Sequence, residues 1–141
     1  MTSDDTMIGN CIVSAEDNEV NQIVLESILA EQDLPFVVVS DGQQAVESWR
    51  ELKPRIILMD ISMPVMNGYD AIRMIRSEEV GTGRHVPIIA LTAHALKGDE
   101  DKCKAAGADH YLTKPVNPDL LLNTIEKIIN DSRPEYLSVV A

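Results

Sequence analysis

Hydrophobic residues fall into two alternating kinds of segment along this chain. Five short apolar runs lie at 11–15, 35–40, 55–60, 86–92 and 109–113. Their large side chains occupy consecutive positions rather than every second one, which is typical of strands buried on both faces of a parallel sheet. The pattern therefore predicts five central strands.

The segments between these runs carry apolar residues at helical spacing. The positions predicted to face the sheet are Val20, Ile23, Val24 and Ile28 in the first segment, Ala45, Val46 and Trp49 in the second, Ala71, Ile72 and Ile75 in the third, and Leu121, Ile125 and Ile128 in the fifth. The fourth segment, about 96–106, is short and polar. Asp41 and Asn117, the latter followed by Pro118, stand where helix N-caps are expected.

Strand and helix thus alternate five times, which predicts an α/β doubly wound fold. In such a (βα)5 three-layer sandwich, a five-stranded parallel sheet lies between two layers of helices. We expect one domain over residues 10–131, with an N-terminal tail at 1–9 and a C-terminal tail at 132–141.

Composition narrows the possible partners. The chain has 141 residues and a net charge of −11, which disfavours nucleic acid or an anionic membrane as a direct partner. No apolar run approaches the roughly 20 residues of a membrane span, and the first residues do not resemble a signal peptide. The two cysteines, Cys11 and Cys103, lack metal-type spacing, so we expect a reduced, cytoplasmic protein.

Polar residues stand at the ends of the predicted strands. Glu16 and Asp17 follow the first strand, Asp60 ends the third, Thr92 ends the fourth and Lys114 follows the fifth. The carboxyl ends of parallel strands meet at one edge of the sheet, where doubly wound proteins bind their ligands.

Three carboxylates at one edge repel one another. Each pair within about 4 Å costs about 4 kcal/mol at an effective dielectric near 20. A nearby cation must offset this repulsion, and either Lys114 or a divalent ion such as Mg²⁺ can do so. Asp60, held at a strand end beside such a cation, could act as a nucleophile toward phosphorus and form an acyl phosphate.

Four stretches of the sequence carry a family resemblance. They are "AEDNEVNQ", "ILMDISMPVMNGYDAIRMIR", "ALTAHAL" and "YLTKPV", in this order. The chain resembles the CheY-like receiver domains of two-component response regulators. The residues within these motifs are most similar to those of the receivers of hybrid histidine kinases. The resemblance implies a flavodoxin-like fold with strand order 2-1-3-4-5.

The resemblance also implies roles for the strand-end residues. Asp60 matches the phosphoacceptor and Lys114 the lysine that pairs with the phosphoryl group. Glu16 and Asp17 match the acidic pair that binds Mg²⁺, Asp17 directly and Glu16 through water. The backbone carbonyl of Ser62 matches a third protein ligand.

The remaining matches concern switching and phosphate lifetime. Thr92 matches the switch hydroxyl and Tyr111 the switch aromatic residue. The bond before Pro115 is expected to be cis. The side chains of Ser62 and His94 are expected to tune dephosphorylation.

The family resemblance implies protein partners rather than a small-molecule substrate. A histidine kinase or a histidine phosphotransfer protein would donate the phosphoryl group from a phosphohistidine. The output would be a conformational change, passed to a downstream protein through the face formed by the fourth helix, fifth strand and fifth helix. The domain would catalyse only its own phosphorylation and dephosphorylation.

The sequence disfavours three other functions. An aspartyl-phosphate phosphohydrolase usually has a second acid two residues after the nucleophile, where this chain has Ser62. A flavin or nucleotide carrier needs phosphate-binding amides in the first loop, where "AEDNE" presents carboxylates. A docking module that is never phosphorylated would not need the complete set of polar strand ends.

Overall fold

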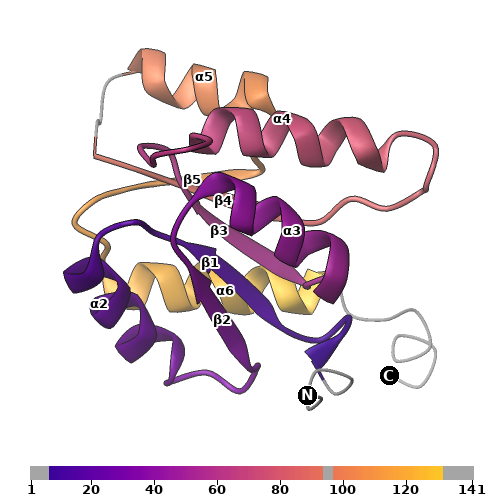
Figure 1. The fold of residues 1–141 in the computed structure, drawn as a ribbon. Coiled ribbons are helices and arrows are strands. Elements are labelled where there is room, and N and C mark those ends of the chain that lie inside the picture. Colours follow the sequence, from indigo (N-terminus) through magenta and orange to yellow (C-terminus); the bar gives the residue numbers. More distant parts are fainter. Residues whose placement is uncertain (1–6, 94–96, 132–141) are drawn as a thin grey trace.

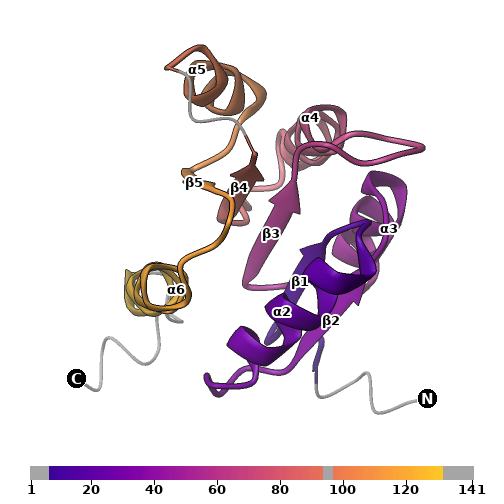
Figure 2. The same ribbon diagram turned by 90° about the vertical axis from the view of Figure 1, so that its left-hand side faces the viewer.

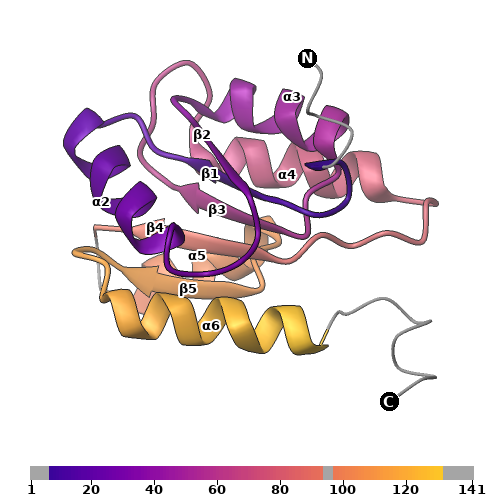
Figure 3. The ribbon, with the colours of Figure 1, turned by 90° about the horizontal axis from the view of Figure 1, so that it is seen from below.

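Ten helices and strands make up the part of the chain that the computed structural model describes, residues 7–93 and 97–131. In chain order they are β1 (Ile12–Ala15), α2 (Glu19–Leu29), β2 (Phe36–Val39), α3 (Gly42–Leu52), β3 (Ile56–Asp60), α4 (Gly68–Glu79), β4 (Ile88–Thr92), α5 (Lys97–Ala106), β5 (His110–Thr113) and α6 (Pro118–Asp131). All strand pairs are parallel and the order is β2-β1-β3-β4-β5, so the predicted topology is confirmed (Figure 1 and Figure 3).

The helices form two layers around the sheet. Helices α2 and α6 cover one face, while α3, α4 and α5 cover the other (Figure 2). Successive side chains of a strand point to opposite faces, so each strand contributes residues to two separate hydrophobic cores. In β3, Ile57 and Met59 pack with α3, α4 and α5, whereas Ile56 and Leu58 pack with α2 and α6. This explains why the central strands are apolar at nearly every position before their carboxyl ends.

Helix α2 departs from the sequence prediction. Val20, Ile23 and Val24 are exposed, at 67%, 62% and 46% of their surface, although they were expected to face the sheet. Leu25 and Leu29 are buried instead, together with Ile28, as expected. The helix is apolar on more than one side, so helical spacing alone could not select the face that packs. An apolar stripe is left uncovered on the first turns of α2.

Helices α3 and α6 begin at the predicted caps. Asp41 caps α3 by accepting a hydrogen bond from Gln44 N at 2.8 Å, and Asn117 Oδ1 accepts from Leu120 N at 3.0 Å. Two further caps, Asn18 and Asn67, start α2 and α4 directly after the loops that follow β1 and β3. These caps fix where the strand-end loops stop.

A partly buried ion-pair network lies at the C-terminal end of α4, away from the strand carboxyl ends. The Arg76 guanidinium donates to Glu79 Oε1 at 2.7 Å, Asp109 Oδ2 at 2.8 Å and the Gly107 carbonyl at 2.9 Å. Glu79 Oε2 in turn accepts from Val86 N at 2.7 Å. The network ties α4 to the segments that precede β4 and β5.

Crossing a membrane would need a longer and more apolar helix than any found in residues 7–93 and 97–131.

Candidate functional site

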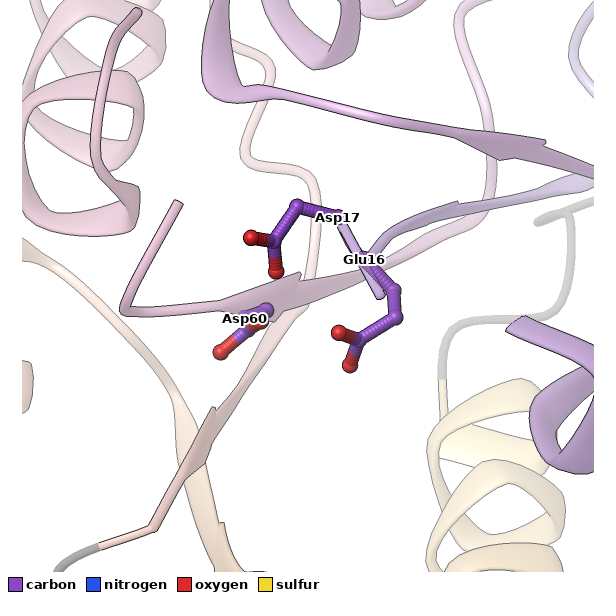
Figure 4. Close-up of side chains that lie close together, drawn as sticks. All are labelled: Glu16, Asp17 and Asp60. Atoms are coloured by element: carbon purple, nitrogen blue, oxygen red, sulfur yellow. The ribbon is translucent and has the colours of Figure 1, made fainter. Parts of the chain in front are cut away.

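Three carboxylates converge at the carboxyl ends of β1 and β3. One oxygen from each of Glu16, Asp17 and Asp60 lies within 4.8 Å of the others, and Figure 4 shows their side chains gathered around one space. Glu16 and Asp60 are almost completely buried, whereas Asp17 is exposed at the mouth. The sequence prediction that strand topology brings these acids together agrees with this arrangement.

Lys114, which follows β5, lies between two of the acids. Its Nζ is 2.9 Å from Glu16 Oε1 and 3.1 Å from Asp60 Oδ2. Burial acts to lower the pKa of Lys114, but hydrogen bonds to the two carboxylates outweigh it and the pKa is raised. The lysine therefore stays charged and offsets part of the repulsion among the acids.

Asp60 is a carboxylate in an unfavourable setting. Burial raises its pKa from 3.8 to about 6; the Lys114 hydrogen bond acts in the opposite direction, and the charge of Glu16 adds to the increase. One lysine thus compensates incompletely for two buried acids, and the site has a remaining affinity for positive charge.

The loop after β1 is held by hydrogen bonds to its backbone. Glu16 N donates to Val39 O at 2.9 Å, and Asn18 N donates to Glu16 Oε2 at 3.1 Å. Gln22, from the second turn of α2, donates through Nε2 to Glu16 O at 2.6 Å. Sequence reasoning missed Gln22, because a polar residue on the first turns of a helix usually faces solvent.

The turn after β3 holds the Asp60 side chain in place through a backbone hydrogen bond. Ser62 N donates to Asp60 Oδ1 at 3.2 Å, and Gly68 N donates to Ile61 O at 2.9 Å. A Cβ atom on Gly68 would lie 2.3 Å from Asp60 O, a backbone atom that cannot move aside. Only glycine allows α4 to start this close to the strand end. Val65, within the turn, has a positive φ of 66°.

Thr92 and Tyr111 lie on the side of the sheet that α5 covers. Thr92 ends β4 and is 2% exposed, and it follows Ala90 by two residues, so both point to the same face. Tyr111 pairs with Ala90 across the sheet and packs, half-buried, against the same core. The strand register thus places Thr92 and Tyr111, the two predicted switch residues, on the face of the sheet that α5 covers.

The structure describes one of the two remaining predicted residues, Pro115, but not the other, His94. The Lys114–Pro115 peptide bond is cis, and Lys114 N donates to Thr92 O at 2.7 Å, which holds the lysine next to β4. His94, expected to tune dephosphorylation, lies outside the described residues.

The donor chemistry of the cluster suits a hard divalent cation. All three side chains offer carboxylate oxygens, with no nitrogen or sulfur ligand among them. Such a set favours Mg²⁺ or Ca²⁺ over Zn²⁺ or copper. It would repel the phosphates of a flavin or nucleotide, so the arrangement disfavours the carrier alternative.

Comparisons with known proteins agree with this geometry. Residues 12–126 match the family described as the response regulator receiver domain. The chain is 40% identical over 136 residues to hybrid signal transduction histidine kinase I of Dictyostelium discoideum; the match covers 90% of this chain and 8% of the relative. The chain spans only 8–13% of the length of the histidine kinases it matches first.

Two solved structures are informative. The receiver domain of sensor histidine kinase PA1611 from Pseudomonas aeruginosa, crystallised with a magnesium ion in its active site cleft, is 43% identical, with a TM-score of 0.77 over 86% of this chain and 98% of that one. The receiver domain of Saccharomyces cerevisiae Ssk1, crystallised with the histidine phosphotransfer protein Ypd1, is 34% identical, with a TM-score of 0.73 over 87% and 88% of the two chains.

The matched residues span both layers of helices and all five strands, and the acidic cluster lies where the sequence motifs place it. This chain therefore belongs to the response regulator receiver domain family, the signalling receivers of histidine kinases and response regulators.

Proposed function

We propose that this domain accepts a phosphoryl group on Asp60 and relays it as a conformational signal. The observation that carries the proposal is the position of Asp60, a buried carboxylate contacted by Lys114 at 3.1 Å and placed beside two further acids. Such a cluster is costly unless it binds cations or transferred groups, and it serves no purpose in packing.

The transfer itself forms one bond and breaks another. A carboxylate oxygen of Asp60 attacks the phosphorus of a partner's phosphohistidine, the new P–O bond forms as the P–N bond breaks, and the imidazole leaves with the bonding electrons and takes up a proton. Ser62 N–H and the Lys114 ammonium each bind one Asp60 oxygen and so fix the plane of the carboxylate. After transfer, Lys114 is placed to pair with a phosphoryl oxygen.

Mg²⁺ is the cofactor that this donor set fits. Glu16, Asp17, Asp60 and the backbone carbonyl of Ser62 would hold it, and when bound it supplies positive charge that neutralises the phosphoryl oxygens. The magnesium ion in the cleft of the 43% identical PA1611 receiver supports this assignment.

Thr92 and Tyr111 are proposed to couple the phosphoryl group to α5. A phosphoryl group adds about 1.5–2 negative charges, toward which the Thr92 hydroxyl can turn. Among the α5 side chains that the structure describes, only Cys103 and Ala106 are buried, so the helix has little apolar anchoring. A shift of α5 would alter the face formed by α5, β5 and α6, where we propose that a downstream protein docks.

The uncovered stripe on α2 is proposed to bind the phosphodonor protein. Val20, Ile23 and Val24 begin three residues after Asp17, so a partner seated on them lies next to the site. Apolar residues grouped this way on a soluble surface are typical of protein docking sites. The complex of the related Ssk1 receiver with Ypd1 supports a histidine phosphotransfer protein as the occupant, and a histidine kinase could use the same surface.

The first experiment measures intact mass after incubation with acetyl phosphate, with and without Mg²⁺. We expect a Mg²⁺-dependent gain of one phosphoryl group that decays with time and is absent in Asp60→Asn. No adduct on the folded protein would refute phosphotransfer and favour the docking-module alternative.

A second experiment isolates the donor surface. Ile23→Asp should slow transfer from a phosphorylated histidine phosphotransfer protein but leave phosphorylation by acetyl phosphate unchanged. Val80→Asp is the matched control, because Val80 is 81% exposed and lies after α4, beyond the other end of the sheet. Equal rates for the two variants would contradict the assignment of the α2 stripe.

The domain limits of 10–131, the cytoplasmic location and the tuning roles of Ser62 and His94 remain predictions. Exchanging the Ser62 side chain should change the decay rate of the adduct without abolishing its formation.

A further inference from the structure

A second candidate binding site lies at the opposite end of the sheet from Asp60. A groove of about 610 Å³ opens between the end of α3, the start of β3 and the segment that joins α4 to β4. Its wall includes Trp49, Arg55 and Pro87. The volume lies within the range of about 300–1,000 Å³ that is typical of small-ligand sites.

The charge of this groove is opposite to that of the protein. Four of the chain's 12 Lys and Arg residues line it, against two of its 23 Asp and Glu residues. The cations are Arg50, Lys53, Arg55 and Arg84. A protein of net charge −11 that concentrates cations in one hollow has a local preference for anions.

The two acids in the groove already have partners. Glu78 is bound by the Arg50 guanidinium through both carboxylate oxygens, and Glu79 is bound by Arg76 and Val86 N. Their charges are therefore largely neutralised by groups of the protein itself.

Three cations remain available to a ligand. Within residues 7–93 and 97–131, Lys53 and Arg84 form no ion pair, and both are exposed at the rim. Arg55 donates to a backbone carbonyl, Ile129 O, at 3.2 Å, and no carboxylate in the described part of the chain forms an ion pair with it. Arginine and lysine in this number are suited to phosphate oxygens.

Trp49 adds an aromatic wall. Its ring is half-buried against the core of α3 and α4 and also lines the groove. We propose that this groove binds a small ligand that joins phosphate to a planar ring, a nucleoside phosphate. The phosphates would contact Lys53 and Arg84, and the ring would lie against Trp49. The inference does not depend on phosphorylation of Asp60.

Trp49 is the single tryptophan of the chain, so its fluorescence reports on the groove directly. We would titrate the protein with ADP in EDTA, which removes divalent ions from the acidic cluster, and excite at the red edge, where adenine does not absorb. A saturable change is expected. Adenosine should bind at least about fivefold more weakly than ADP, and inorganic pyrophosphate should compete.

Variants locate the site. Lys53→Gln combined with Arg84→Gln should weaken ADP binding about tenfold, whereas Lys102→Gln combined with Lys127→Gln, which removes the same charge from α5 and α6, should not. Asp60→Asn should bind ADP like the natural protein. Thermal melts establish that each variant is folded.

Three results would overturn the inference. These are the absence of a saturable signal, equal affinity in the two double variants, and adenosine binding as tightly as ADP. Pyrophosphate binding as tightly as ADP would refute the ring contact with Trp49 and, with it, the ligand class.

Discussion

Replacing Asp60 by Asn should stabilise the metal-free domain at neutral pH. The ionised carboxylate is 2% exposed and its pKa is raised from 3.8 to about 6, chiefly by burial. This shift corresponds to about 3 kcal/mol by which folding disfavours the charged form. Asn has nearly the same shape and no charge. Both Asp60 oxygens are contacted, one by Ser62 N and one by Lys114, and Asn replaces one of them with an NH2 group, so we expect a gain of about 1–3 kcal/mol.

The pH dependence has a defined sign. Because the folded-state pKa is raised, the protonated carboxyl's contribution to stability is fully present below pH 3.8 and is lost as pH rises to about 6. The advantage of Asp60→Asn should therefore be greatest above pH 6, about half as large near pH 5, and absent below the unfolded-state pKa.

Urea denaturation in EDTA at pH 7.5 and pH 5 measures this difference. Asp101→Asn is the control, because Asp101 is exposed on α5 and its loss changes net charge by the same amount. Saturating Mg²⁺ should stabilise the natural protein more than Asp60→Asn and so reduce the difference in unfolding free energy between them. An Asp60→Asn variant that is less stable than the natural protein in EDTA, or a gain that is equal at both pH values, would refute the reasoning.

Three further changes test the site and its support. Asp17→Asn removes one charge from the acidic cluster and should weaken Mg²⁺ binding about tenfold by calorimetry; unchanged affinity would contradict its assignment as a ligand. Gly68→Ala forces a Cβ against the backbone and should cost about 1–3 kcal/mol in urea denaturation, whereas Gly98→Ala, which meets nothing within 4 Å, should cost nothing. Arg76→Met removes the guanidinium that pairs with Glu79 and Asp109 and should cost about 2–4 kcal/mol, because Glu79 is buried and loses its cation. Arg73→Met, whose ion pair is exposed, should cost less than about 1 kcal/mol, and equal losses would show that the Arg76 network adds no more stability than a surface pair.

The sequence by itself determined the fold class and the content of the site, whereas the strand order followed from the family resemblance. Short unbroken apolar runs that alternate with helical segments are typical of central parallel strands, and parallel strands joined by helices end at one edge of the sheet. Chain order and strand direction are therefore enough to predict that Glu16, Asp17, Asp60 and Lys114 lie together, as they do.

Only the tertiary structure decided which surfaces remain uncovered. Val20, Ile23 and Val24 have the same helical spacing as core residues, and their exposure depends on how α2 is rotated against its neighbours. The groove beside Trp49 is assembled from segments far apart in the sequence, because Arg50, Lys53 and Arg55 lie near the end of α3 and Arg84 lies between α4 and β4. Periodicity reports which residues share one side of an element, but packing between elements determines whether that side faces the core or the solvent.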